Sequence, residues 1–272
     1  MTDPHQARSD RLWGESWYFD FAAVDGSLGG FVRVGDYPNL GRRWFWAYLT
    51  TGGRAVGHAV DRPLPGPRDA PWRTDDPALR LLIRPGPDGW RLTAEGVGFA
   101  MDLRWQARAA AYSYARGSRL EQPGWAVGDV DVGGQSLRLD GPGQRDQSWG
   151  IRDWSRLGWT WCAGWLSDGT RYQATRLDAR GRVPPDGYLM APDHRPDPVR
   201  RMAVHPDGVR MNDTLLEFTD VGRVTVDLPP SAGGPSQLRR AVTLVRTAGR
   251  QHGVGWRERN VPLRTARPAS LD

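Results

Sequence analysis

The chain has 272 residues and a mass of 30.3 kDa, enough for one large β-domain or two smaller ones. Its mean hydropathy is low at −0.60, but it contains 14 tryptophans, and because disordered chains are poor in aromatic residues we expect it to fold. The formal net charge is +6, and all 37 basic residues are arginine, which excludes Schiff-base chemistry, a pyridoxal phosphate anchor and a phosphate-binding-loop lysine.

Apolar side chains alternate with a period of two along much of the chain, which predicts β-strands. In residues 15–21, ESWYFDF, Trp17, Phe19 and Phe21 share one face and Asp20 lies on the other. The same pattern predicts four further strands, each with apolar residues on a shared face. In chain order these faces are formed by Trp44, Trp46 and Tyr48 (with Phe45, Ala47 and Leu49 on the opposite face); by Val97, Phe99, Met101, Leu103 and Trp105; by Trp159, Trp161, Ala163 and Trp165; and by Val224, Val226 and Leu228.

Asp-Gly pairs separate these strands and predict tight turns, because Gly accepts a positive φ and Asp can hydrogen-bond its own backbone. Residues 75–84 fit a helix or a strand, and the proline-rich segments 63–72 and 184–198 predict loops. Regular hairpins with little helix favour an all-β barrel or sandwich. The Asp-Gly pairs occupy residues 25–26, 88–89, 140–141, 168–169, 186–187 and 207–208.

The length and two similar blocks of strands predict two β-domains joined near residues 120–130. We expect an N-terminal barrel over residues 10–122 and a C-terminal barrel over residues 123–262. Residues 1–9 and 263–272 are expected to be flexible tails.

Residues 141–154, GPGQRDQSWGIRDW, form the densest cluster of charged and aromatic side chains in the sequence. One interpretation is structural, because a bidentate Arg–Asp pair can pin the end of a strand. Asp146 and Asp153 also have a catalytic interpretation, because a carboxyl kept dry beside tryptophan can stay protonated and act as an acid. Ser148 is not predicted to be a nucleophile, because no helix pattern follows it, as a nucleophile elbow requires.

This segment, together with residues 15–21, 25–49 and 120–140, resembles the superfamily of AttH-like proteins and carotenoid 1,2-hydratases (hydroxyneurosporene synthases), with its Gly-x-x-Arg-Asp-x-Ser-Trp-Gly signature. The resemblance implies two consecutive lipocalin-like antiparallel β-barrels. It also implies activities such as hydration of carotenoid double bonds, proton-initiated terpenoid cyclisation or, as in fungal relatives, pericyclic ring closure. Gln147 stands where many relatives carry His, which leaves an acid role to the carboxylates.

We therefore expect a cofactor-independent enzyme that acts on a hydrophobic isoprenoid or polyene substrate by acid-initiated cyclisation, isomerisation or hydration. A barrel can enclose a small ligand, and tryptophan faces would stabilise a carbocation by about 0.5–2 kcal/mol per contact. The alternative is a non-catalytic lipid- or steroid-binding protein that uses the same cavity. Nucleic-acid binding is a minor alternative, because the arginines are spread along the chain and often lie beside acids.

The predicted site residues fall into three groups. Asp102 faces away from its strand's apolar row and is expected to be a solvent-facing acid, unless that face lines the cavity. The candidate acids are Asp146, Asp153 and Asp102; the candidate substrate-binding residues are Trp44, Trp46, Trp149, Trp154, Trp159 and Trp161; and the candidate structural residues at the domain junction are Arg145, Arg152 and Ser148.

The same sequence predicts no metal and no cofactor. Cys162 is the only cysteine, and the five histidines show no metal-binding spacing. No run of about 18 apolar residues predicts an integral membrane segment. The sequence starts without the apolar stretch of a secretory signal, so a cytoplasmic location is expected. The predicted partner is a hydrophobic small molecule, with no nucleic acid.

Overall fold

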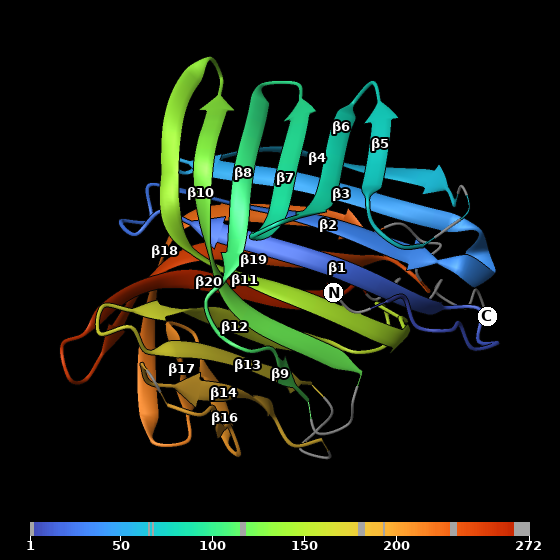
Figure 1. Cartoon of the computed structure of the whole chain (residues 1–272). Helices are drawn as coiled ribbons and strands as arrows, with labels where there is room; N and C mark the ends of the chain where they lie inside the picture. The colour runs from blue at the N-terminus through green and yellow to red at the C-terminus, as the bar shows by residue number, and fades with distance from the viewer. Residues whose placement is uncertain are drawn as a thin grey trace, which may run out of the picture.

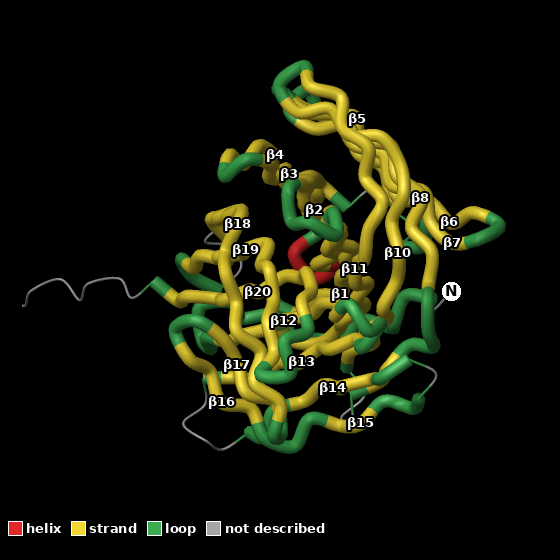
Figure 2. Tube along the Cα trace, turned by 90° about the vertical axis from the view of Figure 1, so that its left-hand side faces the viewer, coloured by secondary structure: helices red, strands yellow, loops and turns green. Residues whose placement is uncertain are grey.

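The computed structural model describes residues 3–64, 66, 68–114, 118–178, 183–192, 194–228 and 233–263. In these residues the fold is all-β, with two antiparallel sheets and one short 3-10 turn, η1 (Pro38–Leu40) (Figure 1). One sheet curls into a nearly closed barrel and the other into a half-barrel (Figure 2). The predicted all-β fold is confirmed. No helix in the described ranges is long and apolar enough to cross a membrane.

The first sheet extends from residue 13 to residue 151. Its strands are β1 (Trp13–Ala22), β2 (Leu28–Tyr37), β3 (Arg42–Thr51), β4 (Arg54–Pro63), β5 (Trp72–Asp76), β6 (Leu79–Gly86), β7 (Gly89–Gly96), β8 (Phe99–Ala107), β9 (Tyr112–Ser113), β10 (Arg119–Val132) and β11 (Gln135–Ile151). The spatial order is β4-β3-β2-β1-β11-β10-β8-β7-β6-β5, with β9 paired to β10. The first and last strands, β1 and β11, are therefore neighbours.

The second sheet follows a similar plan. Its strands are β12 (Trp159–Leu166), β13 (Arg171–Leu177), β14 (Asp186–Met190), β15 (Asp197–Pro198), β16 (Met202–His205), β17 (Gly208–Met211), β18 (Thr214–Leu228), β19 (Ser236–Thr247) and β20 (His252–Pro262). The order is β15-β14-β13-β12-β20-β19-β18-β17-β16, so that the first strand again pairs with the last.

Three apolar clusters follow from the alternation of side chains along these strands. One fills the inside of the first sheet and one the inside of the second. The remaining cluster lies between the sheets and includes Trp46, Trp161 and Trp256. The predicted faces of β3 are confirmed, because Phe45 belongs to the first sheet's core while Trp46 belongs to the cluster between the sheets.

Several local predictions need correction. Val97 is 77% exposed because it lies in a turn before β8. Of the two structures left open for residues 75–84, the strand is confirmed, since residues 79–86 form β6. The segment 184–198 contains β14 and β15, since Tyr188 and Met190 alternate into the core. The Asp-Gly pairs at 140–141 and 186–187 lie inside strands, whereas the other four lie at turns.

The chain changes sheets between Ile151 and Trp159. The boundary expected between residues 122 and 123 falls inside β10, which pairs with β11 without interruption from Arg119 to Val132. Strand β10 continues through Pro123 and Gly124 at this position. The predicted division into folding units and the flexibility of the tails stay predictions, and residues 1–2 and 264–272 lie outside the described ranges.

Candidate functional site

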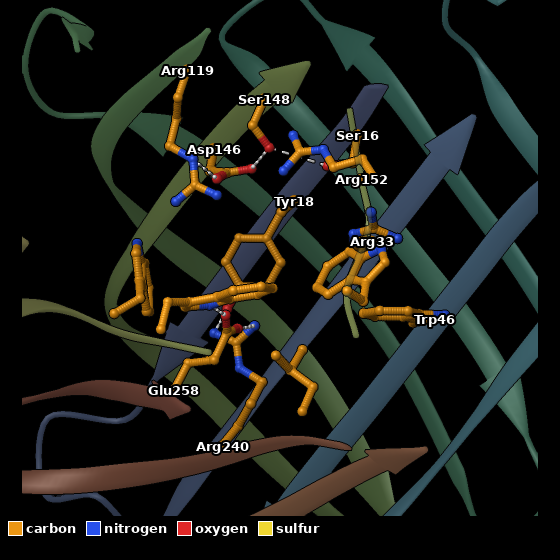
Figure 3. Close-up of a pocket in the computed structure, with 14 residues that line it drawn as sticks. Ser16, Tyr18, Arg33, Trp46, Arg119, Asp146, Ser148, Arg152, Arg240 and Glu258 are labelled. Atoms are coloured by element: carbon orange, nitrogen blue, oxygen red, sulfur yellow. Dashed lines mark hydrogen bonds and ion pairs between the residues drawn. The ribbon is translucent and has the colours of Figure 1, made fainter. Parts of the chain in front are cut away.

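A polar cavity of about 40 Å³ lies between the two sheets, at the face that β1, β2 and β11 turn toward the second sheet (Figure 3). Space of this size holds a few water molecules. The cavity is notable for the number of charged side chains around it, since charge is seldom buried without a partner or a purpose. It is lined by Ser16, Tyr18, Arg33, Trp46, Arg119, Asp146, Ser148, Arg152, Trp154, Trp159, Trp161, Leu238, Arg240 and Glu258.

Tyr18 and Asp20 form the first polar group beside this cavity. Alternation along β1 turns both side chains toward the second sheet, where the Tyr18 hydroxyl donates to Asp20 Oδ2 over 2.7 Å. Arg240, on β19, donates to the same hydroxyl and lies 3.0 Å from a carboxylate oxygen of Glu258 on β20. Burial raises the pKa of Asp20 to about 7, although Arg240, 3.8 Å away, opposes this. The Asp20 carboxyl is therefore partly protonated at neutral pH.

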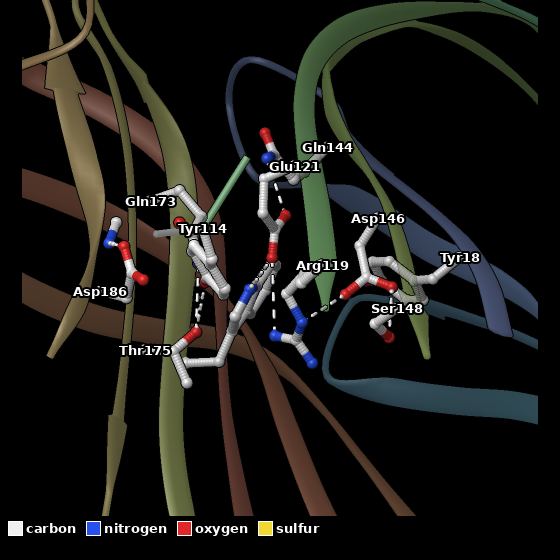
Figure 4. Close-up of polar contacts among 12 residues, drawn as sticks. Tyr18, Tyr114, Arg119, Glu121, Gln144, Asp146, Ser148, Gln173, Thr175 and Asp186 are labelled. Carbon is white, nitrogen blue, oxygen red and sulfur yellow. Dashed lines mark hydrogen bonds and ion pairs between the residues drawn. The ribbon is translucent and has the colours of Figure 1, made fainter. Parts of the chain in front are cut away.

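A second group is centred on Arg119, at the start of β10 (Figure 4). Its guanidinium lies 3.2 Å from Asp146 Oδ2 and 3.6 Å from Glu121 Oε1. Ser148 donates to the other oxygen of Asp146 over 3.3 Å. Burial and the nearby Asp146 charge raise the pKa of Glu121, which accepts hydrogen bonds from Trp161 and from Gln144.

An open cleft of about 540 Å³ adjoins the inner cavity, and this volume suits a ligand the size of a typical metabolite. Arg119, Ser148, Arg152, Trp154 and Trp159 line both spaces, so the inner cavity lies at the floor of the cleft. The remaining lining residues are Tyr114, Ser118, Trp149, Gly150, Ile151, Asp153, Leu157, Thr175, Leu177, Val183, Pro184, Pro185 and Asp186.

The three predicted acids have different surroundings. Asp146 lines the inner cavity and is paired with Arg119. Asp153 lines the outer cleft, but its Oδ1 accepts from the backbone N–H and hydroxyl of Ser155, as in a local turn. Asp102 lies on β8, forms an ion pair with Arg91 and is about half exposed, away from both spaces. The structure thus brings Asp146 and Asp153 to one site and leaves Asp102 outside it.

The predicted tryptophans divide by position. Trp46 and Trp161 line the inner cavity, and Trp149 lines the outer cleft, where His5 stacks on it with 3.7 Å between ring centroids. Trp154 and Trp159 line both spaces. Trp44 lies behind them in the cluster between the sheets.

The predicted junction residues do not form the expected Arg–Asp pairs. Arg145 and Asp146 are consecutive on β11 and point to opposite faces, so they cannot pair. Arg145 lies over the rings of Phe19 and Trp90, where burial lowers its pKa to about 10. Arg152 instead lines the inner cavity and the outer cleft.

Sequence reasoning missed much of the polar site. Tyr18 could have been found with Asp20, because both lie on the polar face of residues 15–21. Arg33, Arg240 and Glu258 carry no local signal, since they are ordinary charged residues in a chain with 37 arginines. The fold brings Arg240 to Tyr18 across 222 positions of sequence.

Solved structures of three proteins share this fold. An AttH-type protein from Nitrosomonas europaea has a TM-score of 0.67 at 14% identity, covering 92% of this chain and 93% of that one. CghA, in a crystal structure with Sch210972, has a TM-score of 0.60 at 11% identity, covering 94% and 90%. Kievitone hydratase from Nectria haematococca has a TM-score of 0.56 at 10% identity, covering 92% and 90%. These matches confirm the fold implied by the sequence resemblance.

The chain has no sequence match among curated proteins. A family model described as a domain of unknown function, DUF7064, matches residues 2–262, and the chain belongs to this family.

Proposed function

We propose that the protein is a cofactor-independent enzyme that binds a hydrophobic isoprenoid or polyene molecule in the outer cleft and transfers a proton to one of its double bonds. The observation that carries this proposal is the Tyr18 hydroxyl beside the cavity, hydrogen-bonded to the buried carboxyl of Asp20, whose pKa is about 7. An acid with a pKa close to neutral can release a proton and recover it within one catalytic cycle.

The proton passes from Asp20 through Tyr18 to the substrate. When Asp20 is protonated, its carboxyl donates to the Tyr18 oxygen and the phenolic O–H is free to point into the cavity. The substrate carbon takes the Tyr18 proton while the Asp20 proton moves to the phenolic oxygen, leaving a carboxylate beside Arg240. A positive charge forms on the substrate at the same time.

The aromatic side chains of the walls stabilise such a charge, whereas the arginines that also line the cavity oppose it. Trp46, Trp154, Trp159 and Trp161 surround the inner cavity, and each indole face stabilises a desolvated cation by about 0.5–2 kcal/mol. Loss of a proton from a neighbouring carbon then gives an isomerised or cyclised product, and attack by water gives a hydrated one. In either case the released proton returns to Asp20.

Two proteins of the same fold support a function that involves small organic molecules. One is named as a hydratase, and the other was crystallised with Sch210972. The first name indicates that a protein with this fold can add water to an organic molecule, and the second structure indicates that one can bind an organic molecule.

The test is conversion of a panel of polyprenoids and polyenes by the purified protein without added metal or nucleotide, followed by chromatography and mass spectrometry. Asp20→Asn keeps the shape of the side chain and removes its transferable proton, so turnover should fall by roughly 100-fold or more while ligand binding remains. Tyr18→Phe should have a similar effect.

Asp129→Asn is the matched control, because Asp129 lies on β10 with its side chain 79% exposed. Asp146, Asp153 and Asp102 remain alternative proton donors. Full activity in Asp20→Asn, with loss in Asp146→Asn or Asp153→Asn, would transfer the role to those residues. Tight binding of several compounds with no turnover would favour the non-catalytic lipid- or steroid-binding protein.

A further inference from the structure

Three arginines at the cavity have buried nitrogens with no hydrogen-bond partner among the described residues, and one of them, Arg240, forms an ion pair with Glu258 through another nitrogen. Arg152 has buried Nε and Nη2 atoms, and Arg33 has a buried Nη1 atom, with no hydrogen-bond partner among the described residues. Arg33 is only 5% exposed, and the absence of a Cβ at Gly35 leaves the space that its guanidinium occupies. Buried guanidinium groups without partners are costly, so their presence calls for an explanation.

The side chains around Arg33 and Arg152 include more arginines than paired carboxylates. Arg119 pairs with Asp146, and Arg240 pairs with Glu258, whereas Arg33 and Arg152 have no carboxylate partner in the described part of the chain. Arg33 instead lies over the Trp46 ring at 4.4 Å. Burial, with Arg119 and Arg33 nearby, lowers the pKa of Arg152 to about 10. The side chains around the cavity therefore carry surplus positive charge.

The position of these groups matches one end of a ligand in the cleft. Arg152 lines the cleft as well as the cavity, and Figure 3 shows it near Arg33 and Ser16. The Ser16 hydroxyl lies 3.3 Å from that of Ser148, and because the Ser148 proton goes to Asp146, Ser16 adds one further donor. A planar guanidinium fork matches a carboxylate in geometry and in charge.

We infer that the molecule bound in the cleft is a hydrophobic carboxylic acid, whose carboxylate enters the inner cavity and binds Arg152 and Arg33. This inference rests on the proposed function only in placing the ligand in the same cleft. The inner cavity, about 40 Å³, fits a carboxylate with the carbons next to it, which brings the double bond nearest the carboxylate to Tyr18, while the rest of the apolar chain remains between the tryptophans of the cleft.

The test compares retinoic acid with retinol, two polyenes that differ in the carboxylate. Their affinities are measured by quenching of tryptophan fluorescence in the whole protein. The wild type should bind retinoic acid at least about 10-fold more tightly than retinol, because charge-assisted hydrogen bonds in a buried site are strong. Arg152→Met should remove most of this preference by weakening retinoic acid binding far more than retinol binding, and Arg33→Met should reduce the preference to a smaller extent.

Arg138→Met is the matched control, since Arg138 is an exposed arginine on β11, and it should change neither affinity. Arg152→Met should not lower the thermal midpoint of the unliganded protein, because it removes an unpaired buried charge. Failure of the wild type to bind retinoic acid, equal affinity for retinol, or a preference that survives in both cavity variants would each overturn the inference.

These outcomes are separable from those of the enzyme assay. Arginine-dependent binding of the acid without turnover of any panel compound would support the inference and contradict the proposed activity. Turnover of neutral polyenes with no preference for the acid would support the proposed activity and contradict the inference.

Discussion

Asp20 illustrates how burial changes the chemistry of a single carboxyl. Its side chain is fully enclosed between the sheets, with Tyr18 Oη, the Gln144 N–H and Arg240 as neighbours. Desolvation is the largest influence and raises its pKa from 3.8 to about 7. The folded protein therefore holds this proton more tightly than the unfolded chain does.

The consequence is a pH-dependent contribution to stability. Protonated Asp20 stabilises the folded state below pH 4, and this contribution, at most about 4 kcal/mol, is lost as the pH rises through about 7. Asp20→Asn cannot titrate, so its free energy of unfolding should fall less between pH 5 and pH 8 than that of the wild type. Urea unfolding at the two pH values checks this, with Asp129→Asn as the exposed control. Equal pH dependence in wild type and Asp20→Asn would contradict the raised pKa.

Strand β11 shows why one element carries the densest part of the sequence. It pairs with β1 on one side and β10 on the other, and it places Asp146 and Ser148 at the cavity. Gly141 lies within this strand and not in a turn. A Cβ there would stand 2.0 Å from the Ala22 carbonyl oxygen, so only glycine allows this approach of the backbones.

Gly141→Ala should therefore lower the free energy of unfolding by about 1–3 kcal/mol, since backbone atoms must move to admit the methyl group. Gly86→Ala is the matched control, because its new Cβ would meet nothing closer than 3.8 Å. We expect the control to differ from wild type by less than about 1 kcal/mol in denaturant titrations. Equal free energies of unfolding for the two variants would contradict this prediction and would show that the backbone of β11 can shift to admit the methyl group at little cost.

At the scale of the whole molecule, the two sheets share a core and a site. Trp256, on β20, is 1% exposed, packs edge-on against Phe31 and donates from its Nε1 to the Phe21 carbonyl oxygen over 3.0 Å. Its ring joins the second sheet to β1 and β2 of the first. The cavity is lined by residues of both sheets as well.

Trp256→Ala should cost about 3–5 kcal/mol, as expected for removing a large buried aromatic side chain. Because the ring packs on both sheets, far-UV circular dichroism and tryptophan fluorescence should shift together in one unfolding transition. Val97→Ala, at a position 77% exposed, should change stability by less than about 0.5 kcal/mol. Separate transitions for the two signals would mean that the sheets unfold as independent units.

Local patterns in the sequence determined the strands and much of the aromatic lining. The alternation in residues 15–21 and 44–49 assigns each side chain to a face, because a strand turns successive residues to opposite sides. For the same reason Trp159 and Trp161 could be predicted to share a face, whereas Trp154 lies in a turn between β11 and β12. Tertiary structure alone decided the polar site, because Tyr18 and Arg240 belong to different sheets and their contact depends on how those sheets pack. It also decided which arginines are left without partners, since Arg152 and Arg119 look alike in sequence and differ only in what the fold places beside them.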